Sequence, residues 1–263
     1  MSYFVQVAAT TFAPTQHVSG AWNADEQHIA PAFGLLAHMV EADRDRRRDD
    51  GLVISRLSYD ILGTVPMDEV EVAVRVLRHG KTIELVEAVL SHHQRPAVLL
   101  RAWLLRPGNT SPHAASDLPM IPAPNEVPAW DPTTVWPGGY IASTEVHRAE
   151  TRPGRAVFWV RSNLPLLEAE AHPLASRTAT AAGHLDIANG MTVRGDPRDL
   201  AFPNIDLTAH LFRPPSGDWL GFDTTVSFDP TGQGLTSSVL HDLAGPFGTM
   251  AQALTVRPGR SNR

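Results

Sequence analysis

The sequence repeats one layout of residues after 150 positions, and this repeat constrains the fold more than any other feature. Leu57-Ser58 begins a strand-like run in the first half, and Leu207-Thr208 begins another in the second. An aspartate follows eleven residues later and an Arg-Pro pair closes each unit: Asp68 with Arg106-Pro107, and Asp218 with Arg257-Pro258. A repeat at a fixed period predicts one structural unit used twice, with sites at the seam between the copies.

A helix-like segment precedes each strand-rich run. Residues 32–42 place apolar side chains at helical spacing, and residues 179–190 are rich in small side chains that permit close packing on a sheet. A further helix is predicted at 165–177. Residues 70–77 alternate apolar and polar side chains, as a half-buried strand does. The other predicted strands are 3–12, 15–22, 52–62, 83–90, 97–105, 156–162, 205–212, 219–228, 234–242 and 248–256.

A proline-rich segment at 107–139 separates the two halves. It holds eight prolines, which remove backbone donors and break helices, so we interpret it as a linker. The predicted organisation is an N-terminal unit at 1–106, this linker, and a C-terminal unit at 140–263. Each unit would be a central helix wrapped by a mostly antiparallel sheet, which is the hot-dog arrangement. Two tandem units predict an α+β double hot dog.

Charge and composition exclude several classes of protein. The net charge of −6 argues against a basic nucleic-acid-binding face, and the absence of cysteine excludes disulfides and thiolate chemistry. The N-terminus lacks the pattern of a signal peptide, and no apolar run approaches the roughly 18 residues of a membrane helix. We therefore expect a cytoplasmic protein without a membrane span. The twelve histidines show no spacing of the HExxH kind, so no metal site is predicted.

Three segments of the second half carry a resemblance to a known family. They are AAGHLDIAN at 181–189, NIDLTAHLFRP at 204–214 and GTMAQALTVR at 248–257. Together they resemble the central helix, the following strand and the last strand of the acyl-CoA thioesterase II (TesB-like) group of double hot-dog proteins. The resemblance extends over nearly the whole chain.

The resemblance implies a set of site residues. Asp186 occupies the position of the family's catalytic Asp, and Gln252, five residues before Arg257, occupies that of its catalytic Gln. Asn204 stands where the family usually has Thr or Ser, and its amide can both donate and accept hydrogen bonds. The implied function is hydrolysis of fatty acyl-CoA to free fatty acid and CoA, with no cofactor. A homo-oligomer, a dimer of double hot dogs, is also expected.

Thioester hydrolysis needs an activated water, a polarised carbonyl and a leaving thiolate. A carboxylate such as Asp186 can act as general base toward the water, and a neutral amide such as Gln252 can orient it. Hot-dog folds resemble each other in using backbone N–H groups at a helix N-terminus for the oxyanion. We expect these groups near Gly183, which would let the thioester approach closely.

Several alternatives stay open at this stage. An acyl-thioester hydratase or dehydratase would use a His with an Asp, for which His28 or His38 could pair with Asp25 or Asp43. A non-catalytic acyl-CoA or lipid-binding protein would keep only the pocket.

Three further positions bear on these readings. Ala37 in the first half stands where Asp186 stands in the second, which suggests one active half and one that shapes the acyl pocket. Asp206 could be a second carboxylate or a structural residue. The charge run at 44–50 is interpreted as a solvated loop.

Overall fold

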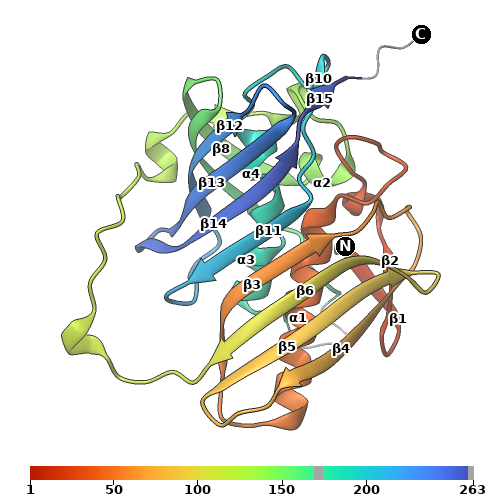
Figure 1. Cartoon of the computed structure of the whole chain (residues 1–263), viewed down its shortest axis with the longest axis vertical. Helices are drawn as coiled ribbons and strands as arrows, with labels where there is room; N and C mark the ends of the chain where they lie inside the picture. The colour runs from red at the N-terminus through yellow and green to blue at the C-terminus, as the bar shows by residue number, and fades with distance from the viewer. Residues whose placement is uncertain (169–173, 260–263) are drawn as a thin grey trace.

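The computed structural model describes residues 1–168 and 174–259, and its strands form two antiparallel sheets. The large sheet has 13 strands in the order β1-β2-β4-β5-β6-β3-β11-β14-β13-β12-β9-β8-β7, and β10 pairs with β15 separately (Figure 1). The first half supplies β1 (Phe4–Ala8), β2 (Thr11–Pro14), β3 (Val53–Ile61), β4 (Val70–Arg78), β5 (Ile83–His92) and β6 (Arg95–Leu105). The second supplies β7 (Ala129–Trp130), β8 (Thr144–Arg152), β9 (Arg155–Ser162), β10 (Leu200–Ala201), β11 (Asp206–Leu211), β12 (Leu220–Phe228), β13 (Gln233–Asp242), β14 (Gly245–Thr255) and β15 (Arg257–Pro258).

The two halves join where β3 pairs with β11. Thr208 lies opposite Ser58, and their hydroxyl oxygens are 3.0 Å apart. On either side, Leu207 lies opposite Tyr59 and Ala209 opposite Leu57. An offset of 150 converts the pair Leu207–Tyr59 into the pair Leu57–Ala209, which is the pattern of a local two-fold axis between Ser58 and Thr208. The 150-residue period in the sequence is the offset that this axis requires.

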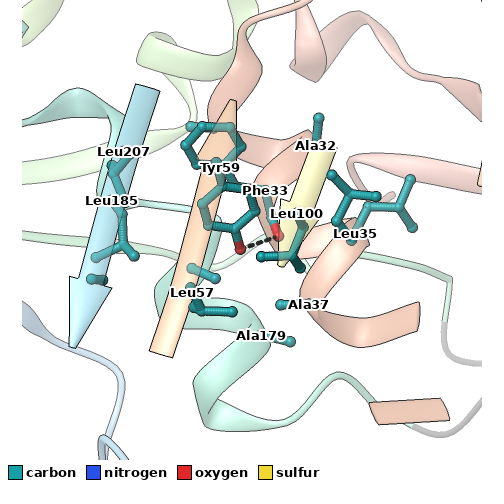
Figure 2. Packing of buried hydrophobic residues seen from close by; sticks show 14 of the residues in the cluster. Ala32, Phe33, Leu35, Ala37, Leu57, Tyr59, Leu100, Ala179, Leu185 and Leu207 are labelled. Atoms are coloured by element: carbon teal, nitrogen blue, oxygen red, sulfur yellow. Dashed lines mark hydrogen bonds between the residues drawn. The ribbon is translucent and has the colours of Figure 1, made fainter. Parts of the chain in front are cut away.

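One long helix crosses the concave side of the first half. α1 (Ile29–Arg47) is buried at nearly every position from Ala30 to Glu41, as a helix wrapped by a sheet must be. Phe33 stacks on Tyr59 of β3 with ring centroids 3.8 Å apart, and the Tyr59 hydroxyl donates to the Phe33 carbonyl at 2.9 Å (Figure 2). These contacts fix the start of α1 against the strand at the seam.

The charge run at 44–50 is not the solvated loop that the sequence predicted. α1 continues through Arg47, and Arg47 and Arg48 each place a guanidinium nitrogen 2.7 Å from a carboxylate oxygen of Glu84 on β5. Glu84 is fully buried, and a buried carboxylate without a partner is costly. The two arginines are therefore held by this long-range ion pair, which local sequence patterns do not reveal.

The helix of the second half is broken into short pieces. α3 (Arg177–Ala182) ends at Gly183, and it is followed by the 3-10 turn η5 (Leu185–Ile187) and by α4 (Ala188–Met191). The helix predicted at 165–177 is wrong where the structure describes it, because Tyr3 and Phe4 donate backbone hydrogen bonds to Pro165 and Leu166 as in a sheet. Residues 169–173 lie outside the described part.

The proline-rich segment runs over the surface between the halves, drawn in yellow-green in Figure 1. Along the chain it contains the 3-10 turns η2 (Ser111–His113) and η3 (Pro124–Glu126), then β7 and the 3-10 turn η4 (Pro132–Thr134), and α2 (Gly139–Ala142) begins at its last residue. Trp159 Nε1 donates to the Pro122 carbonyl at 2.8 Å, so part of the segment is fastened to the second half. The boundaries 1–106, 107–139 and 140–263 stay a prediction.

Several smaller elements also differ from the prediction: the strand expected at 3–12 is divided into β1 and β2, and the short strands β7, β10 and β15 were not predicted. β8 was not predicted, and the expected strand at 15–22 holds instead the 3-10 turn η1 (Gln16–Val18). Within 1–168 and 174–259, no helix combines the length and the apolar composition needed to cross a membrane.

Candidate active site

Asp186 lies in the broken helix of the second half and lines a large cavity. The break at Gly183 turns the chain into η5, and the Asp186 side chain ends up buried beside the start of α1. The cavity has a volume of about 1100 Å³. Its walls come from the 20–29 loop, the end of β3, η5 with α4, and the 197–204 and 257–259 segments. Both halves therefore contribute to it, as a site at the seam requires.

Asn204 and Gln252 both contact Asp186. Asn204 lies just before β11, and its Nδ2 donates to Asp186 Oδ1 at 2.7 Å. Gln252 lies on β14, and its Nε2 donates to the backbone carbonyl of Asp186 at 3.3 Å. Three residues predicted from separate motifs are thus brought together by three different elements. Asn204 lines the cavity with Asp186, whereas Gln252 is fully buried behind them.

The side-chain amide of Gln252 has an oxygen that forms no hydrogen bond within the described part of the chain. Its Oε1 is buried and has no hydrogen-bond partner among the residues that the structure describes. A buried acceptor without a partner costs free energy, so this oxygen can still accept a hydrogen bond that no described residue donates.

Burial sets the protonation of Asp186. Removal from water raises the pKa of Asp186 to about 6, although the hydrogen bond from Asn204 acts in the opposite direction. A carboxyl group with this pKa is ionised at neutral pH and still basic enough to accept a proton, which suits a general base.

His28 also lies beside Asp186, although the family motifs do not include it. Its Nδ1 lies 3.8 Å from Asp186 Oδ2 and accepts a hydrogen bond from the Ala30 N–H at the start of α1. Burial, with His184 nearby, lowers the pKa of His28 to about 3, so the ring is neutral. The repeat could not indicate this contact, because His28 belongs to the other half.

Tyr140 holds the chain in place at the break that follows α3. Its hydroxyl donates to the Gly183 carbonyl at 2.9 Å and lies 2.9 Å from His184 Nδ1, and its ring packs on His28. Burial lowers the pKa of His184 to about 4, so this ring is neutral as well. Sequence patterns did not single out Tyr140, which comes from the short α2 after the proline-rich segment.

The structure places Gly183 at the C-terminal end of α3, whereas the oxyanion role predicted for it requires a helix N-terminus. Its N–H donates to the Ala179 carbonyl at 3.1 Å at the end of α3, not at a helix start. Gly183 packs against Gly34 of α1 and is not among the described residues that line the cavity. Its N–H is therefore committed to the helix, and the predicted oxyanion role does not fit this arrangement.

The first half carries apolar residues at the matching positions. The residues 150 positions before Asn204 and Gln252 are Ile54 and Ala102, and both are buried in the core. Asp206, the other carboxylate considered, accepts a hydrogen bond from the Ala253 N–H at 2.6 Å on its Oδ1, which is a structural contact between β11 and β14.

Two family profiles match the chain. The acyl-CoA thioesterase N-terminal domain matches residues 18–105, and the acyl-CoA thioesterase C-terminal domain matches residues 112–256. No curated protein sequence matches significantly.

Solved structures resemble the chain over nearly its full length. A hot-dog-fold protein of unknown function from Alicyclobacillus acidocaldarius superposes with a TM-score of 0.73 at 12% identity, covering 96% of this chain and 95% of that one. Acyl-CoA thioesterase II TesB2 from Mycobacterium marinum gives a TM-score of 0.66 at 15% identity, covering 98% and 96%. The tesB protein of Mycobacterium avium subsp. paratuberculosis gives 0.66 at 16%, covering 97% and 96%. At these identities the similarity establishes the fold, and it confirms the predicted double hot dog.

Proposed function

The chain belongs to the acyl-CoA thioesterase family, and we propose that it hydrolyses fatty acyl-CoA to a free fatty acid and CoA at Asp186. The observation that carries the proposal is the buried carboxylate of Asp186 on the cavity wall, held by Asn204 at 2.7 Å. The pKa of about 6 that burial gives Asp186 fits a base that works at neutral pH.

In the proposed reaction, Asp186 takes one proton from water while the water oxygen adds to the thioester carbonyl carbon. The tetrahedral intermediate then collapses, the carbon–sulfur bond breaks, and the departing thiolate receives the proton from Asp186. Gln252 Oε1, which has no partner among the described residues, would accept the second hydrogen of the attacking water. Asn204 would hold the carboxylate in place. No cofactor enters this scheme.

The start of α1 is suited to stabilise the oxyanion. His28 and Ile29 line the cavity, and α1 is 19 residues long, so the positive end of its dipole borders the reacting centre. The Ala30 N–H is bonded to His28 Nδ1 and residue 31 is a proline, so the helix dipole and the Ile29 N–H would provide this stabilisation. We assign this role to α1 in place of Gly183.

The cavity also offers surfaces for both parts of the substrate. Trp22, Ile61 and Met191 are among its apolar lining residues and would contact the acyl chain. Arg198 and Arg257 lie on its wall near the small β10–β15 sheet, where cations would suit the phosphates of CoA.

The test is hydrolysis of an acyl-CoA panel from short to long chains, followed by thiol release. Asp186→Asn and Asp186→Ala should lower kcat by about 10²–10⁴-fold, the usual contribution of a general base. Asp60→Asn is the matched control, because Asp60 is an exposed carboxylate on the neighbouring strand β3. Turnover that survives both Asp186 variants would place the site elsewhere.

A hydratase is the second candidate, because His28 lies 3.8 Å from Asp186. The hydrogen bond that His28 Nδ1 accepts from Ala30 occupies the nitrogen that faces Asp186, which favours hydrolysis. Hydration of an enoyl-CoA that stops in His28→Ala would favour the hydratase. Acyl-CoA binding without turnover of any thioester would indicate a binding protein.

A further inference from the structure

Two histidines and an aspartate converge on the surface of the first half, at the end of β5, which lies two strands from the seam strand β3. His92 ends β5, His93 begins the turn to β6, and Asp68 lies in the loop before β4. His92 Nε2 is 3.1 Å and His93 Nε2 is 3.5 Å from the same oxygen, Asp68 Oδ2. The three ligand atoms all lie within 4.8 Å of one another. We propose that Asp68, His92 and His93 bind a divalent transition-metal ion.

The separations match those of ligands on one metal ion, and the 3.1 Å contact is also the length of a hydrogen bond between His92 Nε2 and Asp68 Oδ2. Zinc lies about 2.0–2.2 Å from imidazole nitrogens and carboxylate oxygens, so two ligand atoms at a tetrahedral angle are about 3.3–3.6 Å apart. An octahedral ion brings neighbouring ligands to about 3 Å. The two measured separations, 3.1 and 3.5 Å, lie in this range without any side-chain movement.

The carboxylate of Asp68 is already oriented for this role. Its Oδ1 accepts a hydrogen bond from the Glu69 N–H at 2.8 Å, which leaves Oδ2 directed at the two imidazoles. Its backbone carbonyl accepts from Gln27 Nε2 at 2.9 Å. Such supporting contacts are typical of metal ligands and increase the affinity of the site.

The hairpin turn adopts an unusual backbone conformation. His93 and Gln94 have φ of 48° and 63°, in the left-handed region that glycine usually occupies. Asn-Gly or Asp-Gly would form such a two-residue turn at lower cost. Unfavourable backbone angles at a cluster of ligand-type side chains are consistent with selection for the position of those side chains.

In the second half, an ion pair holds the matching turn between β13 and β14. The counterpart of His92, 150 positions later, is Asp242, which forms a two-pronged ion pair with Arg213 at 2.5 and 2.8 Å. The counterpart of Arg213 in the first half is Gly63, so no cation comes from that position. A bound metal ion would supply the positive charge between Asp68 and the turn that Arg213 supplies in the other half.

The ligand set defines the class of ion. Two imidazoles and one carboxylate favour Zn²⁺, Ni²⁺ or Cu²⁺, whereas Mg²⁺ prefers oxygen ligands alone. An ion here would tie the β5–β6 turn to the loop that holds Gln27, and Gln27 lines the cavity. The site would therefore stabilise one wall of the cavity without touching Asp186.

The test is titration of the tag-free, chelator-treated chain with ZnCl₂ by calorimetry, with MgCl₂ in a parallel arm. We expect one zinc per chain, a higher melting temperature with zinc, and no comparable binding of magnesium. His92→Ala and Asp68→Asn should weaken zinc binding by at least about tenfold, since even residues that only support ligands contribute that much.

His79→Ala is the matched control, because His79 is an exposed histidine in the turn between β4 and β5, outside the cluster. All variants should melt like the wild type without zinc. Three results would each overturn the proposal: no saturable zinc binding, unchanged affinity in the His92 and Asp68 variants, or equal affinity for magnesium. None of these readouts depends on hydrolysis, so the proposed function is tested separately.

Discussion

At the scale of single residues, the hydrogen bond from Asn204 tunes Asp186. Burial raises the pKa of Asp186 to about 6, and this hydrogen bond lowers it from what burial alone would give. We predict that kcat/KM falls below pH 6 as the base is protonated. In Asn204→Ala this fall should begin at a higher pH, because the contact that favours the charged form is lost. Asn204→Thr keeps a donor and should restore the wild-type profile.

The measurement is the pH dependence of kcat/KM for the three proteins on one acyl-CoA. Coincident acidic limbs in wild type and Asn204→Ala would rule out this tuning. A loss of rate at every pH without a shift of the limb would mean that Asn204 acts on the water or the substrate instead.

The same buried carboxylate should cost the protein stability. The pKa of Asp186 is about 6 in the folded state because of burial, and its ordinary value is 3.8, so the folded state binds the proton more tightly. The contribution of Asp186 to stability is therefore most favourable below about pH 4 and decreases as the pH rises to 6. Above pH 6 the ionised group costs about 3 kcal/mol. Asp186→Asn should remove most of this cost at pH 8 and little of it at pH 4.

Urea unfolding at both pH values measures this difference, with Asp60→Asn as the control that changes an exposed charge. Equal unfolding free energies for wild type and Asp186→Asn at pH 8 would contradict the prediction. A stabilised but inactive variant would show that the position is kept for chemistry at the expense of stability.

At the scale of elements, the sequence predicted strands better than helices. β3, β4, β5, β9 and β12 lie within a few residues of their predicted ranges, because alternation and turn residues are local signals. The ends of α1 and the break at Gly183 depend on Glu84, Tyr140 and Gly34, which are distant in sequence. For the same reason the motifs could predict Asp186, Asn204 and Gln252 but not His28.

The contact between α1 and α3 should tolerate no side chain at Gly34. A Cβ there would lie 3.0 Å from the Ala179 carbonyl oxygen and from Gly183 Cα, which are backbone atoms of the element that carries Asp186. We predict that Gly34→Val destabilises the protein by about 1–3 kcal/mol, the usual cost of overpacking. Helix propensity favours Val over Gly and alone would make the variant more stable. A loss of stability would therefore come from the clash.

Urea unfolding curves give the free energy, and Gly108→Val is the control because an added Cβ there meets nothing within 4 Å. If Gly34→Val is as stable as the wild type, the two helices can separate without cost. Lower kcat in a folded Gly34→Val protein would show that the contact also positions Asp186.

At the scale of the whole molecule, the repeat determines the architecture and the site. The two-fold axis at Ser58 and Thr208 places the start of α1 from one half beside Asp186 from the other. The period in the sequence predicted two units, but it gave no information about which faces meet. The dimer of double hot dogs and the cytoplasmic location stay predictions.

If the seam holds the halves together, the covalent link at 107–117 should be dispensable. These residues are all exposed and pair with no strand of either sheet. A protease site inserted between Ala115 and Ser116 should therefore be cut in the native protein, and the two fragments should stay together through β3, β11 and the α1–α3 contact. Size-exclusion chromatography, denaturing gels and the thioesterase assay measure this.

Because the tether raises the effective concentration of each half, the cut protein should melt at a temperature that depends on its concentration, unlike the uncut one. Fragments that separate under native conditions, or that stay together but lose activity while Asp186 remains intact, would mean that the link itself orients the halves.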